Sequence, residues 1–161
     1  MAVVSNWTLG IDPGYSGAFV LMSPDGDVEP KFSWKMPLIG DAKARDYDIE
    51  AMGLILNSGV SVDAEIYCEN FASYALGTTA VKSLVRCVTI IEMLAREYAM
   101  PLHIVPSQTW QKIALVGTDK EMKPKARALI AAERIFGAES RKWSEGVRDA
   151  ALIAWYGSRK Q

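Results

Sequence analysis

The stretch Trp7-Thr8-Leu9-Gly10-Ile11-Asp12, which runs directly into Pro13-Gly14-Tyr15-Ser16-Gly17, decides the fold class. Apolar residues alternate with small or polar ones up to Asp12, as in a β-strand, and the glycine-rich run that follows is typical of a turn. A second apolar strand is expected over Ala18 to Met22. Pro24-Asp25-Gly26-Asp27 then predicts a hairpin before a third strand from Val28 to Met36. Three strands joined by short turns predict an antiparallel meander.

Beyond the meander, the chain alternates between helical and strand patterns. No element is assigned between Pro37 and Asp46, where the chain is polar, and Gly59 is expected to stop the first helix. We expect helices over residues 48–57, 79–98, 106–114, 124–136 and 145–156, and strands over 64–69 and 101–105. Helical crossovers place these later strands parallel to the first. The sequence therefore predicts one α/β domain over residues 1–161, with a mixed five-stranded sheet flanked by helices.

Composition limits the classes of protein to consider. Half of the 161 residues are apolar and 23% are charged, as in an ordinary globular protein. No apolar run approaches a membrane span and the first residues do not resemble a signal peptide, so we expect no membrane partner and a cytoplasmic location. Cys68, Cys87 and a single histidine are too few for a disulfide scaffold or a Cys–His zinc site.

Charge is distributed unevenly along the chain. The net charge is −1, but residues 1–111 carry a net of −6 and residues 112–161 a net of +5. Such asymmetry indicates a polyanionic partner, although a solvated helix surface of mixed charge explains it equally well.

Four carboxylates stand out from this pattern. Asp12 and Glu69 each end an apolar strand, where capping a turn is the ordinary explanation. Asp149 shares its helix face with apolar residues at positions 152, 153 and 156, so that face should point into the core, where an unpaired carboxylate is unfavourable. Glu145 lies one turn earlier on the same face and would repel Asp149, unless Arg148 offsets one of the two charges.

A divalent cation is the alternative way to stabilise such a cluster. Mg²⁺ prefers carboxylate oxygens, and two such ions can support phosphodiester hydrolysis. We therefore expect a site for two Mg²⁺ ions, with Mn²⁺ as a substitute, held by Asp12, Glu69, Glu145 and Asp149.

Three motifs resemble those of one known family. Residues 10–18, 66–71 and 146–154 are similar, in the same order, to the three acidic motifs of RuvC-type Holliday junction resolvases of the RNase H-like superfamily. Together with the order of elements, the resemblance covers almost the whole chain. The bacterial family usually has its third acid three residues before the last Asp, where this chain has Gly146. Viral and phage relatives often have it four residues before, where this chain has Glu145, so a phage-like or viral-like member acting in the host cytoplasm is expected.

This resemblance implies a metal-dependent endonuclease that resolves four-way DNA junctions by paired symmetric nicks. It also implies a homodimer with the long helix near the dimer axis. The residues that it marks as DNA contacts are Phe71, Tyr74, Lys82, Arg86, Lys112, Lys123 and Lys125. Core packing explains Phe71 equally well. A solvated surface position explains each of the basic residues equally well. Trp110 and Trp143 are interpreted mainly as packing residues.

Three other functions remain open at this point. An actin-like sugar kinase also begins with a strand that carries an early acidic motif, but it needs two duplicated domains. A different RNase H-like nuclease could act on flap or branched DNA or on RNA–DNA hybrids. A non-catalytic nucleic-acid-binding module could share the fold.

Overall fold

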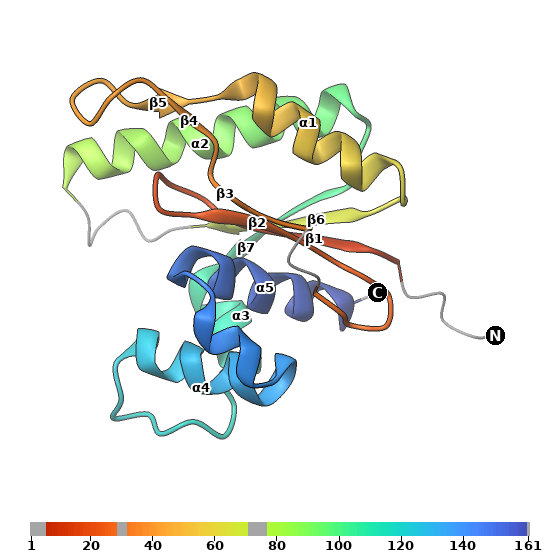
Figure 1. Ribbon diagram of the computed structural model, residues 1–161, viewed down its shortest axis with the longest axis vertical. Helices are drawn as coiled ribbons and strands as arrows, with labels where there is room; N and C mark the ends of the chain where they lie inside the picture. Colours follow the sequence, from red (N-terminus) through yellow and green to blue (C-terminus); the bar gives the residue numbers. More distant parts are fainter. Residues whose placement is uncertain (1–5, 29–31, 71–76, 161) are drawn as a thin grey trace.

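The centre of the protein is a five-stranded mixed sheet (Figure 1). The computed structural model describes residues 6–28, 32–70 and 77–160. The strands of this sheet are β1 (Thr8–Asp12), β2 (Ala18–Met22), β3 (Ser33–Lys35), β6 (Glu65–Asn70) and β7 (Leu102–Pro106). In the order β3-β2-β1-β6-β7, the first three pair antiparallel, whereas β6 runs parallel to β1 and β7 parallel to β6. The predicted meander with parallel additions is confirmed.

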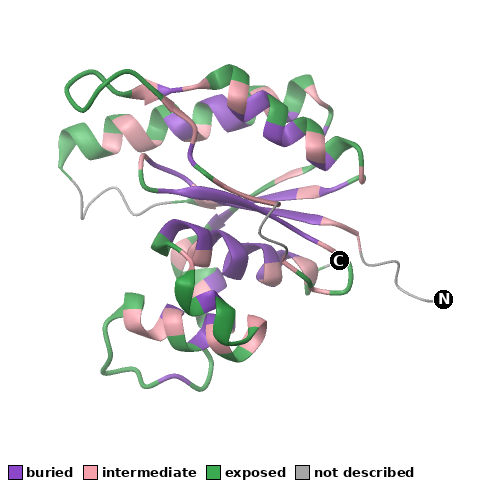
Figure 2. Cartoon of the chain, viewed as in Figure 1, coloured by how far each residue is buried: buried purple, intermediate pink, exposed green. Residues whose placement is uncertain are grey.

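Helices cover both faces of this sheet (Figure 1). One face carries α1 (Ile49–Val60) and α2 (Thr78–Glu97), and the other carries α3 (Ser107–Ala114), α4 (Pro124–Phe136) and α5 (Glu145–Ser158). A short 3₁₀ helix, η3 (Ala138–Lys142), connects α4 to α5. The sheet and the inner side of α5 are the most continuously buried parts (Figure 2). Among the described helices, none is long and apolar enough to cross a membrane.

Helix α5 lies unusually close to β1, and small residues make this possible. A Cβ atom on Gly10 would overlap the backbone of Ala150 and Ala154. Because these two alanines are also buried, backbone meets backbone with little side chain between them. This contact fixes the helix that carries Asp149 against the strand that ends at Asp12.

Three local expectations were wrong. The third strand was expected from Val28 to Met36, but β3 covers only Ser33–Lys35. The polar segment before α1 contains a small second sheet, β4 (Leu38–Ile39) paired with β5 (Asp46–Tyr47), which the sequence pattern did not predict. Gly59 does not stop α1, which continues to Val60, because Gly59 is packed against Met100 and Ala64. Tertiary packing overrides local preference at Gly59 and in the small sheet. In the small sheet, Tyr47 is buried in the core between the main sheet and α2.

Candidate active site

Asp12 and Glu69 lie side by side at the carboxyl ends of two parallel strands. The register pairs Ile11 of β1 with Cys68 of β6, so the next residue of each strand is one of the two acids. The pKa of Asp12 is raised well above its usual value, first by burial and then by the charges of Asp149, Glu69 and Glu145 and by a hydrogen bond with Glu69. Asp12 is therefore inside a cluster of like charges.

Helix α5 supplies the other two acids of the cluster. Ser144 caps the helix, because its Oγ accepts a hydrogen bond from the backbone N–H of Val147 at 3.3 Å. This cap begins the helix at Glu145 and places Asp149 one turn further along. The pKa of Asp149 is raised to about 7, first by burial and then by the charges of Glu69 and Glu145, whereas Arg148 and Lys125 lower it. The structure thus brings all four predicted acids within electrostatic reach of one another.

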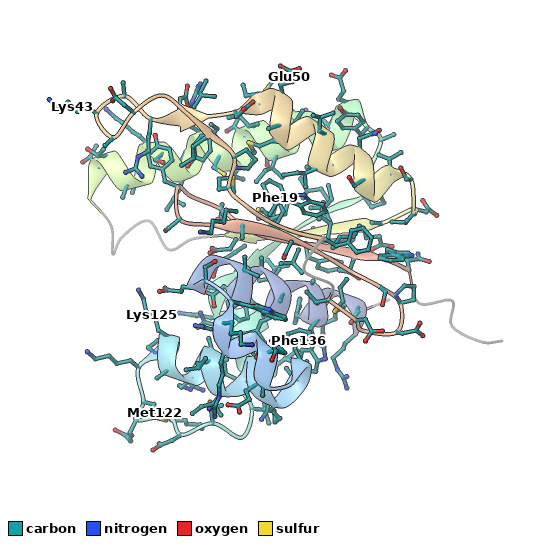
Figure 3. All side chains as sticks on the ribbon, in the orientation of Figure 1. Phe19, Lys43, Glu50, Met122, Lys125 and Phe136 are labelled. Atoms are coloured by element: carbon teal, nitrogen blue, oxygen red, sulfur yellow. The ribbon has the colours of Figure 1, made fainter. Side chains whose placement is uncertain are left out.

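Glu145 differs from the other three because it is exposed and paired. Its Oε1 atom lies 2.9 Å from Nζ of Lys125, and the two side chains are 49% and 75% exposed. Lys125 extends from the start of α4 toward α5 (Figure 3). The structure therefore connects a predicted metal ligand to a predicted DNA contact, and this surface ion pair is weak enough to exchange for other partners.

Trp110 contacts the acidic cluster in a way that its sequence position did not indicate. Its indole Nε1 donates a hydrogen bond to Oε1 of Glu69 at 3.1 Å. The side chain is 1% exposed and packs with Tyr67, Val105 and Leu152, so it is a packing residue as expected. It is also a positioning residue for Glu69. The sequence contains only a general indication of this hydrogen bond, because a buried indole N–H needs an acceptor.

Arg148 does not neutralise the cluster through an ion pair. Its Nη2 donates to the backbone oxygen of Trp143 at 3.0 Å, and its buried Nε has no hydrogen-bond partner among the described residues. Within that part of the chain it forms no ion pair with Glu145 or Asp149. Its charge still lowers the pKa of Asp149, but the net effect on that carboxyl is a rise.

The donor set suits a divalent cation, although the side chains do not converge on one point. Across residues 6–28, 32–70 and 77–160, no three His, Cys, Asp or Glu side chains are close enough together to hold one metal ion. The reason is visible in the contacts, since Glu145 is turned to Lys125 and Glu69 to Trp110. Four carboxylates, two of them with raised pKa values, nevertheless form the hard-oxygen, negatively charged environment that Mg²⁺ prefers. A cavity of about 180 Å³ adjoins Glu145 and Asp149.

The remaining predicted DNA contacts that the structure describes lie on both sides of the sheet. Phe71 and Tyr74 are outside the described residues. Lys82 and Arg86 are exposed on α2, and Arg86 donates two hydrogen bonds to the carboxylate of Asp46. On the opposite side of the sheet, Lys112 is exposed in the last turn of α3, and Lys123 immediately precedes α4.

The sheet order, the flanking helices and the acids at the ends of β1 and β6 define an α/β protein of the RNase H-like fold. Comparison with solved structures agrees. The chain is similar to Thermus thermophilus RuvC in complex with Holliday junction substrate, with a TM-score of 0.63, 14% identity and 96% of each chain covered. A second structure of Thermus thermophilus RuvC is similar with a TM-score of 0.61, 15% identity and the same coverage. Neither the protein-family models nor the curated proteins give a match.

Proposed function

We propose that this chain is a metal-dependent endonuclease that resolves four-way DNA junctions by paired symmetric nicks. The observation that carries the proposal is the cluster of Asp12, Glu69, Glu145 and Asp149 on a fold similar to that of RuvC. Carboxylates that repel one another destabilise a fold, so their presence is best explained by a cation that they bind. The spacing of Glu145 from Asp149 supports a relationship to phage or viral resolvases.

Each part of the site has a proposed role. Asp12, Glu69 and Asp149 would hold two Mg²⁺ or Mn²⁺ ions, and Glu145 would join them once it leaves Lys125. When bound, such ions activate a water molecule and stabilise the leaving 3′ oxygen of a phosphodiester. Trp110 keeps the Glu69 carboxylate in one orientation. Lys112, Lys123 and the released Lys125 would contact backbone phosphates, which increases affinity in a salt-dependent way.

Paired nicks also require a second copy of the active site, and the outer face of α2 suits the dimer contact. Val85 and Met93 are exposed apolar residues there, 50% and 65% exposed. Together with Ile49 of α1 they line a mainly apolar depression, whose lining also includes Lys82, Arg86, Arg96 and Glu97. Large exposed apolar patches are typical of protein interfaces. We propose that two copies pack along α2, so that both acidic clusters face one junction.

A comparison of substrates tests the proposed activity. Wild type, Asp12→Asn and Asp149→Asn are incubated with Mg²⁺ and a synthetic four-way junction, a linear duplex, a flap or an RNA–DNA hybrid. We expect symmetric nicks in the junction alone, and a loss of at least about 100-fold in both variants. Equal cutting of the duplex, or full activity in either variant, would contradict the proposal. Preferred cutting of the flap or hybrid would instead support a different RNase H-like nuclease.

A further inference from the structure

The β4–β5 hairpin, residues 38–47, is fastened to the turn that follows Asp12. The hydroxyl of Tyr15, in that turn, donates a hydrogen bond to the backbone oxygen of Arg45 at 3.0 Å. The Arg45 guanidinium lies over the Tyr15 ring, 5.2 Å from its centroid, in a cation–π contact. The same ring packs against Tyr47 with the centroids 5.0 Å apart. Both the backbone and the charged group of Arg45 are therefore held by one aromatic residue, three positions after Asp12.

A second set of contacts fastens the hairpin to α2. Nε and Nη2 of Arg86 donate to the two carboxylate oxygens of Asp46 at 2.7 and 2.6 Å. The hydroxyl of Tyr47 donates to the backbone oxygen of Ser83 at 3.0 Å. Because β4 and β5 have only two residues each, their own pairing cannot fix the hairpin in place. The contacts with the turn and with α2 do so.

These contacts surround an open cavity of about 730 Å³. Its lining begins at Pro13, directly after the strand that ends in the acidic cluster, and it includes three basic residues, Arg45, Lys82 and Arg86. No acidic residue is among the lining residues in the described part of the chain. Asp46 already compensates the charge of Arg86, whereas Arg45 and Lys82 form no ion pair with any described carboxylate. Two cations without a carboxylate partner among the described residues thus face one cavity, whose lining follows Asp12 directly along the chain.

We propose that this cavity binds a backbone phosphate of the nucleic-acid strand that leads into the acidic cluster, with Arg45 and Lys82 as its contacts. The inference rests on the proposed function and adds the β4–β5 hairpin to the DNA-binding surface. A carboxylate cluster repels a phosphodiester chain, so cations that contact the same strand compensate part of that repulsion. Arg86 acts in this proposal through Asp46, because its guanidinium positions the hairpin; its expected DNA contact stays a prediction.

A salt titration tests the contacts. Binding of a fluorescein-labelled four-way junction is measured by anisotropy in EDTA, from about 50 to 200 mM NaCl. The proteins are wild type, Arg45→Gln, Lys82→Gln, the double variant and the control Lys43→Gln. Lys43 lies at the tip of the same hairpin, extends away from the protein and does not line the cavity (Figure 3).

Loss of this one phosphate contact in the double variant should make the slope of log K against log [salt] shallower by about 0.9, and each single variant should show part of that change. Lys43→Gln should keep the wild-type slope. Wild-type binding with unchanged slopes in Arg45→Gln and Lys82→Gln would overturn the inference and leave the proposed function standing. Absence of wild-type binding to the junction would overturn both.

Inorganic phosphate distinguishes a strand contact from a small-anion site. Thermal unfolding of wild type and Arg45→Gln is compared in 10 to 50 mM phosphate at constant ionic strength. We expect no difference in protection, because one phosphate of a strand is bound weakly on its own. Saturable protection of wild type alone, together with unchanged DNA slopes, would assign the cavity to a small anion and contradict the proposal.

Discussion

At the scale of single residues, the acidic cluster lowers the stability of the protein that contains it. The pKa of Asp149 is about 7 in the folded protein, compared with an ordinary value of 3.8. At a pH below 3.8 the Asp149 carboxyl is protonated in both the folded and the unfolded state, so it does not lower the free energy of unfolding. As the pH rises from 3.8 to 7, the unfolded chain releases its proton first, so the folded state loses relative stability. Above pH 7 the carboxyl is ionised in both states, and the loss of stability reaches its full size.

Asp149→Asn should therefore stabilise the metal-free protein at pH 8 and have little effect at pH 3.5. Since one pKa unit is worth about 1.4 kcal/mol and the neighbouring acids relax together, we expect a gain of about 1 to 3 kcal/mol at pH 8. Urea unfolding in EDTA at both pH values measures it, with Asp25→Asn, an exposed turn residue, as the control. A variant less stable than wild type at pH 8 would show that the carboxylate is satisfied without a metal.

Trp110→Phe tests the contact that orients Glu69. Phenylalanine keeps most of the buried ring but has no N–H to donate to the carboxylate. Loss of such a partner of a metal ligand typically costs about 10- to 100-fold in metal affinity or activity. We expect a higher Mg²⁺ concentration for half-maximal nicking, and a smaller rise of Tm on addition of Mg²⁺.

Trp155→Phe is the matched control for this change, because Trp155 lies on α5 and its ring contacts Arg159 instead of an acid. An identical Mg²⁺ dependence in Trp110→Phe and wild type would reduce Trp110 to a packing residue.

The candidate site could be predicted from the sequence only in part. Asp12, Glu69 and Asp149 follow from acids at the ends or on the buried faces of apolar elements, a pattern that local sequence contains. The hydrogen bond from Trp110 joins residues 41 positions apart, and the ion pair of Lys125 with Glu145 depends on how α4 packs against α5. Such contacts depend on tertiary geometry, which periodicity does not encode.

At the scale of elements, the active site depends on the close contact between β1 and α5. Gly10→Ala should destabilise the protein by about 3 kcal/mol, because the added methyl group overlaps the backbone of α5. It should also reduce nicking strongly by separating Asp12 from Asp149.

Denaturant unfolding and the junction assay measure the two effects. Gly77→Ala is the control, since nothing lies within 4 Å of its added methyl group, and it should cost less than about 1 kcal/mol. Equal midpoints for Gly10→Ala and wild type would mean that α5 does not pack on β1 as described.

Elements with strong periodicity were the predictable ones. Helix α4 has the expected limits, with proline at its first position and Gly137 directly after its end. The β4–β5 hairpin was not predicted, because strands of two residues carry no periodic signal and are held by Tyr15, Ser83 and Arg86 from distant segments. The hairpin that borders the proposed phosphate site could therefore not be predicted from the periodicity of apolar residues.

At the scale of the whole molecule, the proposed function depends on two copies of the chain. A junction has two strands to cut, and one acidic cluster can cut only one of them at a time. The outer face of α2 is the surface proposed to join the copies, and Met93 is its most exposed apolar residue at 65%. A charge there would lose its hydration at the two-fold contact, which is unfavourable.

Met93→Glu should therefore convert the proposed dimer to a monomer without unfolding it. The monomer should nick a junction once and release it, whereas wild type should cut both strands in one encounter. Light scattering measures the mass, and a plasmid-borne cruciform separates single nicks from paired ones. Leu54→Glu is the control, because Leu54 is 66% exposed on α1 but lies outside the α2 depression. If Met93→Glu stays dimeric, or wild type is already a monomer, α2 does not join the copies and symmetric cleavage needs another interface.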